Sequence, residues 1–120
     1  MTGTKGKRDY FYTHMVRKSD LEDRHLYINQ RVGAFIARNN VCPGYYNYLL
    51  KDERILDSIF IYETGTANQG NLGIDSIRRT RVQIPPLEEQ VEIAEHLDKK
   101  CHSIDSEIER KKILIDKLND

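Results

Sequence analysis

The residue types that carry catalysis occur in this chain of 120 residues, but they are not spaced as a reaction requires. No two of the four histidines lie four residues apart, and His96 and His102 would face different sides of one helix. Cys101 and His102 are adjacent, so their side chains point apart and form no nucleophile–base pair. No C-x-x-C, H-E-x-x-H or G-x-S-x-G motif occurs, and Pro85 and Pro86 lack the polar and aromatic neighbours of an adenine methyltransferase motif. The sequence therefore predicts no catalytic residue, no metal ligand and no cofactor.

Two polar stretches are suited instead to contact with a nucleic acid. Near the N-terminus, basic residues are interleaved with aromatic ones, a mixture that can neutralise phosphates and pack against sugars. Further along, Asn68, Gln69 and Asn71 lie in a Gly-rich stretch, and each amide can form the paired hydrogen bonds that read an adenine edge. A solvated hairpin and an ordinary turn are the alternatives for these two stretches, because Asn and Gly form turns readily.

The net charge of zero conceals an asymmetry along the chain. Residues 1–85 carry 13 Lys and Arg against 9 Asp and Glu, whereas residues 86–120 carry 6 against 10. The first part is therefore net +4 and the last part net −4. A mildly basic head on an acidic tail is compatible with an anionic partner at the head.

The longest predicted element is a helix over residues 85–120. Pro85 and Pro86 suit the entry to a helix, and Glu88 and Glu89 then place negative charge at the positive end of the helix dipole. No Gly or Pro follows, so the helix should run close to the C-terminus, over about 45–50 Å at 1.5 Å per residue.

Apolar residues recur along this helix in two columns with heptad spacing. The columns are Leu87, Ala94, Cys101, Ile108 and Ile115, and Gln90, Leu97, Ile104, Lys111 and Leu118. Alternating spacings of four and three residues are typical of a coiled coil. Val91 and Ile93 widen the apolar face in the first two turns, which could dock on the head. Beyond them the head is too small to cover the stripe, so we expect pairing with another chain, with register influenced by the polar Gln90 and Lys111. The predicted pairing residues are Ala94, Leu97, Cys101, Ile104, Ile108, Ile115 and Leu118.

Shorter elements are expected before this helix. Alternating large residues predict a strand over 9–14, polar residues predict a loop over 19–24, and Ile, Val and Phe predict one or two buried strands over 26–38. Asn39 and Asn40 predict a turn, and Cys42 and Pro43 open a first helical stretch, which a second follows over 55–62. A stretch dense in Gly, Thr and Asn predicts a long loop over 62–73. We expect a short turn over 74–77, and the alternating pattern that follows predicts a strand over 78–84.

The run VQIPPLEEQVEIAEHLD at residues 82–98 resembles the end of a target recognition domain in the specificity subunit of type I restriction-modification systems. In that family a strand enters a proline pair, followed by Leu-Glu-Glu-Gln and a long conserved-region helix. TGTANQGNLGIDSIRRTRVQIP at 64–85, LYINQRVGAF at 26–35 and GTKGK at 3–7 are similar to further segments of the family, in the expected order. The resemblance covers nearly the whole chain.

The resemblance implies an α+β fold, in which a small mixed domain of the target recognition type is followed by a long C-terminal coiled-coil helix. Residues 1–84 would form the latter part of a DNA-binding target recognition domain, and residues 85–120 the conserved-region helix. Two such helices pack antiparallel in the family and space two recognition domains. A full subunit has two domains and two helices, so two copies of this chain could supply each other's missing helix. The residues expected to contact DNA are Lys5, Lys7, Arg8, Asn68, Gln69, Asn71 and Arg78.

The resemblance also implies a non-catalytic DNA-recognition subunit whose partners are DNA, the methyltransferase and restriction subunits, and a second copy of this chain. The alternatives are a dimerising coiled-coil adaptor that binds no DNA, and a truncated remnant without function. Neither a signal peptide nor an apolar run of membrane-spanning length is visible, so we expect a cytoplasmic protein. Cys42 and Cys101 belong to different predicted elements and are expected to be reduced.

Overall fold

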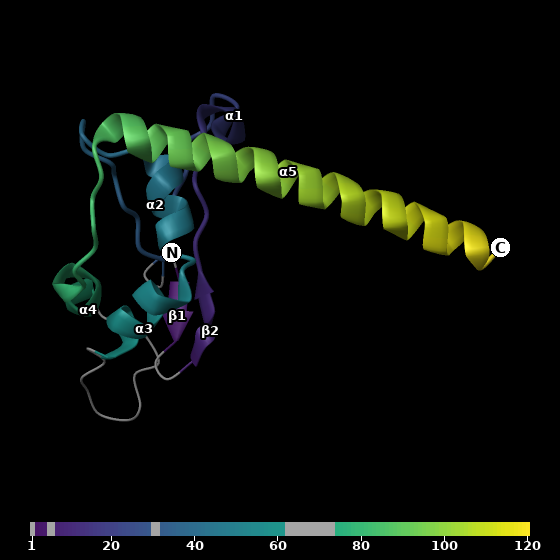
Figure 1. Ribbon diagram of the computed structural model, residues 1–120. Coiled ribbons are helices and arrows are strands. Elements are labelled where there is room, and N and C mark those ends of the chain that lie inside the picture. The colour runs from purple at the N-terminus through teal and green to yellow at the C-terminus, as the bar shows by residue number, and fades with distance from the viewer. Residues whose placement is uncertain (1, 5–6, 30–31, 62–73) are drawn as a thin grey trace.

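The computed structural model describes residues 2–4, 7–29, 32–61 and 74–120 of the chain. Within these residues the fold is mostly helical, with one short antiparallel hairpin (Figure 1). The elements are β1 (Thr2–Thr4), β2 (Lys7–Tyr12), α1 (Lys18–Leu21), α2 (Pro43–Leu49), α3 (Glu53–Ile61), α4 (Ile74–Arg79) and α5 (Leu87–Leu118). The predicted α+β class is therefore supported only in its coarsest form, a small head that contains a hairpin and a long C-terminal helix.

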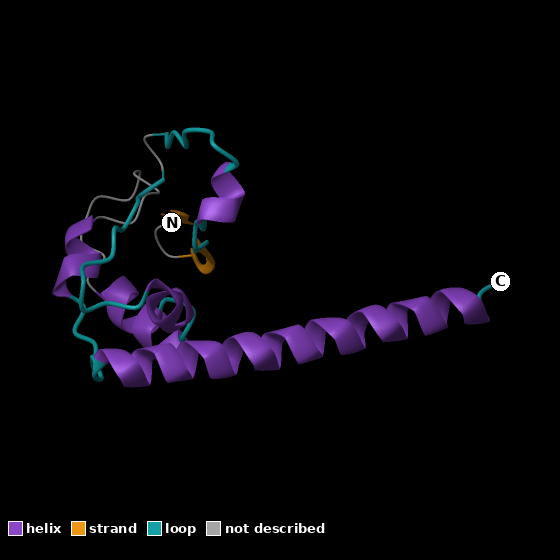
Figure 2. Cartoon of the chain, turned by 90° about the horizontal axis from the view of Figure 1, so that it is seen from above, coloured by secondary structure: helices purple, strands orange, loops and turns teal. Residues whose placement is uncertain are grey.

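Helix α5 confirms the predicted long C-terminal helix. It contains 32 residues, begins after Pro86 at the N-cap, and carries Glu88 and Glu89 in its first turn. At 1.5 Å per residue its length is about 48 Å, close to the 53 Å that the whole molecule measures along its longest axis. Figures 1 and 2 show the second half of α5 extending away from the head, with the C-terminus at its far end.

The first turns of α5 pack against α2 of the head. Ala94 is 5% exposed, and a Cβ added to Gly44 of α2 would lie 3.3 Å from the Cβ of Ala94. Glycine at this position thus permits the two helices to approach closely. The predicted docking of the first two turns is confirmed, but the buried residues are Gln90 and Ala94, whereas Val91 remains 38% exposed.

A second small cluster lies at the other end of the head, where α3 packs against β2 and α4. Ile59 of α3 is 1% exposed and is the most completely buried apolar side chain among the described residues. The rings of Phe60 and Phe11 meet edge to face, with centroids 6.3 Å apart. The two helices after Cys42, the turn at Asn39 and Asn40, and a strand near residues 9–14 all occur as predicted, with shifted bounds.

The strands predicted over residues 26–38 do not form in the described part of this segment. Residues 26–29 and 32–38 follow an irregular path, and the exposed side chains include Tyr27 at 87% and Ile36 at 92%. A strand requires a neighbour to satisfy its backbone groups, and the hairpin of β1 and β2 pairs only with itself among the described residues. The apolar composition of this segment was therefore a misleading indicator of strand structure.

Two further local predictions were wrong. The strand predicted over 78–84 is replaced by the end of α4, which reaches Arg79, and by an extended but unpaired segment that leads to α5. The loop predicted over 19–24 contains the single turn α1, because the Asp20 carboxylate accepts a hydrogen bond from the Arg17 backbone N–H at 2.7 Å. This turn ends where Glu22 and Asp23 adopt positive φ angles of 43° and 62°.

Candidate functional site

The joint between head and helix is centred on Gln90, whose side chain is 0% exposed. Its Oε1 accepts a hydrogen bond from the backbone N–H of Cys42 at 2.9 Å. Its Nε2 donates to the backbone oxygens of Pro85 at 2.8 Å and of Asn40 at 3.3 Å. One side chain therefore satisfies backbone groups on both sides of the joint, where a buried polar group without a partner would be costly.

A second polar contact lies farther along α5. The hydroxyl of Tyr48 in α2 donates a hydrogen bond to the Asp98 carboxylate at 2.6 Å, and the ammonium of Lys51 lies 5.8 Å from the centroid of the Tyr48 ring. The Asp98 carboxylate raises the pKa of Tyr48 above its usual 10.0, because it accepts a hydrogen bond from the neutral phenol and repels the phenolate. Burial and the neighbouring Cys101 thiol add to this increase in the Tyr48 pKa.

We expect the Tyr48 phenol to ionise in the last step of an alkaline absorbance titration, above pH 10. Because its pKa in the folded chain lies above the unfolded value of 10.0, its contribution to stability is complete below pH 10 and is lost as the pH rises through the folded pKa. Tyr48→Phe should remove the last ionisation step, whereas Tyr27→Phe at an exposed site should leave it. An unchanged last step in Tyr48→Phe would contradict the hydrogen bond to Asp98.

Beyond this joint the predicted pairing stripe is open to solvent. Cys101 is exposed, and the exposed fractions of Ile104, Ile108, Ile115 and Leu118 are 56%, 46%, 56% and 84%. Leu97 is half-buried, and Ala94 is already covered by α2. The seven predicted pairing residues therefore fall into two groups. The head covers the stripe near Ala94, and the residues from Cys101 onward are exposed and available to a partner.

Charged residues border the free part of the stripe. Asp105 and Lys112 lie seven residues apart on one side, and Lys100 and Glu107 lie seven apart on the other. The Glu107 carboxylate accepts hydrogen bonds from Arg110 at 2.8 Å and lies 3.8 Å from the Lys111 ammonium. Lys111, the polar member of the stripe, is therefore partly neutralised within its own helix.

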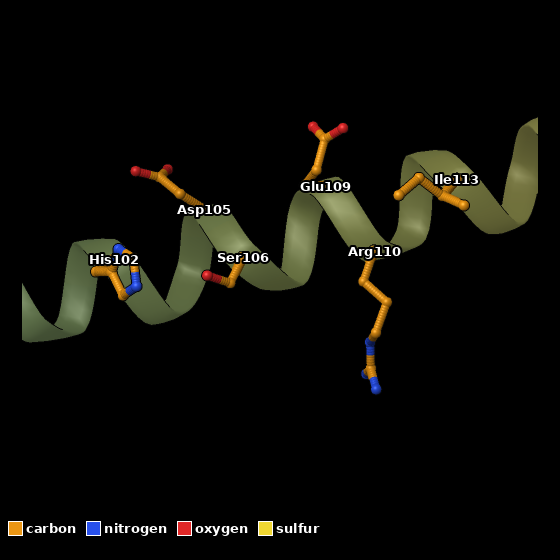
Figure 3. A pocket seen from close by; sticks show the side chains of 6 residues that line it. All are labelled: His102, Asp105, Ser106, Glu109, Arg110 and Ile113. Atoms are coloured by element: carbon orange, nitrogen blue, oxygen red, sulfur yellow. The ribbon is translucent and has the colours of Figure 1, made fainter.

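A shallow hollow runs along the face of α5 away from this stripe. Figure 3 shows its side chains on a single helix, with Glu109 and Arg110 extending in opposite directions. The lining residues are His102, Asp105, Ser106, Glu109, Arg110 and Ile113. No second element closes over them, and the described part of the chain contains no group of three His, Cys, Asp or Glu arranged to hold a metal ion. We therefore assign no small-molecule site to this face.

The predicted DNA-contacting residues are only partly placed. Lys7 and Arg8 are the first two residues of β2, and Arg78 is exposed in the last turn of α4, with its Nη1 3.9 Å from the Asp75 carboxylate. The remaining four, and the whole predicted loop over 62–73, lie outside the described residues. These four are Lys5, Asn68, Gln69 and Asn71.

The sequence predicted that the first two turns of α5 dock on the head, but it did not identify the side chains that hold this joint. Gln90 was expected at an interface between chains, and Tyr48 carried no assigned role. The polar side chain at a heptad position directly after a proline pair was the available signal for Gln90. No periodicity indicates Tyr48, because its partner lies 50 residues away in the sequence.

Other sequence expectations concern the cysteines and the membrane. Cys42, half-buried, and Cys101, exposed, are both free thiols, as expected. No helix among the described residues is long and apolar enough to cross a membrane.

Comparison with models of known protein families gives a match over most of the chain. The model of the type I restriction modification DNA specificity domain matches residues 11–116, which include most of the head and nearly all of α5. No curated protein and no solved structure matches the chain.

Proposed function

The chain belongs to the family of type I restriction modification DNA specificity domains, and from this we propose that it is a DNA-recognition subunit, or half of one. In this proposal residues 1–84 form part of a target recognition domain that binds DNA, and residues 85–120 form the helix through which the chain assembles. Methyltransferase and restriction subunits would then carry out the chemistry. The support is the family match together with the small head from which a long helix extends.

The observation that carries the assembly part of the proposal is the free apolar stripe from Cys101 to Leu118. Exposed apolar side chains arranged in heptads indicate a partner helix. We propose a second copy of this chain as the partner. The identical stripe is self-complementary, as a twofold interface requires.

The head restricts how two copies can pair. In a parallel dimer, each partner helix would run back along the stripe toward Gln90 and Ala94. That space is occupied by α2, which contacts Ala94 and, through Tyr48, Asp98. An antiparallel partner whose residues 101–118 pack along residues 101–118 of the first chain avoids this clash, because the stripe near Ala94 and Asp98 is left to the head. We therefore propose antiparallel pairing of the two free halves.

Charge fixes one register for this antiparallel pair. When the centre of symmetry lies between Glu109 and Arg110, Ile104 of one chain faces Ile115 of the other. Asp105 of one chain and Lys112 of the other then lie about 3 Å apart along the axis, close enough to pair, once on each side of the dyad. The two Glu92 side chains would be separated by about 50 Å along the axis, at 1.5 Å per residue. The paired helices would thus hold two heads at a fixed distance.

Charge reversal tests this register. Asp105→Lys should weaken the dimer roughly fivefold, since two attractive pairs become repulsive at a cost of about 0.5 kcal/mol each. The double variant Asp105→Lys with Lys112→Asp should restore affinity, and raising the salt concentration should reduce both effects. Sedimentation equilibrium measures the dissociation constants. Additive weakening in the double variant would exclude the proposed register.

The DNA part of the proposal has its own test. Selection from a random-sequence duplex pool by the full chain, with a methyltransferase subunit of a type I system present, should enrich a defined motif. Binding should weaken steeply with salt, because phosphate contacts release counterions. A chain that dimerises but enriches no sequence would instead be a coiled-coil adaptor, and one that neither dimerises nor binds DNA would be a remnant without function.

A further inference from the structure

Three arginines follow one another closely where α4 ends. Arg78 and Arg79 occupy the last turn of α4, Arg81 comes two residues later, and all three are exposed. The single acidic residue in this part of the chain is Asp75, 3.9 Å from Arg78. Arg79 and Arg81 have no carboxylate within ion-pair distance among the described residues.

The backbone that carries these arginines is held in place from the inner side. Ser76 is 8% exposed, and α4 packs against α3. Thr80, half-buried between Arg79 and Arg81, donates its hydroxyl to the Ser76 carbonyl at 3.0 Å and its N–H to the Ile77 carbonyl at 3.1 Å. Ser76 and Thr80 thus face the head, whereas the arginines face solvent. The backbone that carries the arginine side chains is therefore held in a fixed position.

Two other arginines of the head, Arg24 and Arg54, differ from this pair in their electrostatic surroundings. Arg24 lies 2.9 Å from Glu22, and Arg54 lies 3.0 Å from Asp52, whose pKa it lowers by hydrogen bonding and charge. Such pairs offer little net charge to an approaching anion. Arg79 and Arg81, without such a pair among the described residues, keep their full positive charge. Figures 1 and 2 show α4 at the side of the head away from the free half of the acidic helix α5. An anion can therefore approach them without passing that half of the helix.

We infer that Arg79 and Arg81 form a phosphate-binding pair that grips the DNA backbone, an inference that rests on the proposed DNA-recognition function. Two guanidinium groups on a fixed segment, with no ion-pair partner among the described residues, suit phosphate oxygens, which accept charge-assisted hydrogen bonds from arginine. Phosphate contacts fix position and orientation on the duplex and carry no base preference. The pair would therefore contribute to affinity for every sequence, whereas Arg78, beside Asp75, would contribute less.

The test compares two charge-matched variants of the full chain. Arg79→Ala with Arg81→Ala should lower affinity for random-sequence duplex DNA and make the slope of log K against log salt shallower by about 1.8 per bound chain, at 0.9 per phosphate. Lys99→Ala with Lys117→Ala removes the same charge from α5 and should leave the slope unchanged. Fluorescence anisotropy over a salt series measures both.

The conservative variant separates charge from folding. Arg79→Lys with Arg81→Lys keeps both charges and should retain most of the slope, and circular dichroism should show the same helix content in all variants. An equal slope in the two alanine variants would overturn the phosphate pair while leaving DNA recognition in place. No binding by the unsubstituted chain would overturn both, and a slope change with an acidic peptide but not with DNA would reassign the pair to a protein partner.

Discussion

Gln90→Leu is expected to lower the free energy of unfolding by about 3 kcal/mol or more. The leucine fills the space but leaves the Cys42 N–H and the Asn40 and Pro85 carbonyls without their present partner. Each buried backbone group left unpaired costs about 1–3 kcal/mol. The loss should appear in urea denaturation followed by tyrosine circular dichroism, which reports on the head.

Gln83→Leu is the matched control for this change. Gln83 lies on the segment that enters α5, and its side chain is exposed, so its replacement should alter stability by no more than about 0.5 kcal/mol. Equal midpoints for the Gln90 and Gln83 variants would show that the buried amide does not hold the joint. A Gln90 variant that keeps the helix but loses tyrosine dichroism would show that the head alone depends on it.

Ile104→Asp with Ile108→Asp is expected to weaken self-association at least 100-fold. A dimer would have to bury four carboxylates in place of four isoleucine side chains, each worth about 1.5–3 kcal/mol when fully buried. Even if each isoleucine contributes only half of this burial energy, the loss summed over four sites exceeds about 2.7 kcal/mol. That free energy corresponds to a 100-fold change in the dissociation constant. Sedimentation equilibrium over a concentration series measures the change, and the far-ultraviolet spectrum should show an intact head.

The control for this pair is Ile113→Asp, on the face of α5 away from the stripe. Ile113 is 48% exposed, as open to solvent as Ile108, yet the proposed register leaves it outside the interface. Its replacement should leave the dissociation constant within about twofold, as expected for a surface site. Equal weakening by both changes would mean that association does not use the heptad stripe. Unfolding of the head in the double variant would mean that the stripe belongs to the core of one chain.

The long helix and its apolar stripe could be predicted from the amino-acid sequence. Both follow from local sequence patterns. The proline pair and the acidic residues mark the start of α5, and the heptad spacing of apolar residues marks its apolar face. The helices after Cys42 follow from similar signals. These features need no information about distant residues, because a helix satisfies its hydrogen bonds within itself.

The place where the head meets the helix, and the segments that become strands, depend on contacts between residues distant in the sequence. Gln90 and Ala94 occupy heptad positions like those farther along, and they are buried because α2 lies against them. Residues 26–38 have a composition typical of strands, but no neighbouring strand pairs with the described part of this segment, so its apolar side chains remain exposed. In both cases the outcome depends on a surface supplied by residues distant in the sequence, and that surface exists only once the chain has folded.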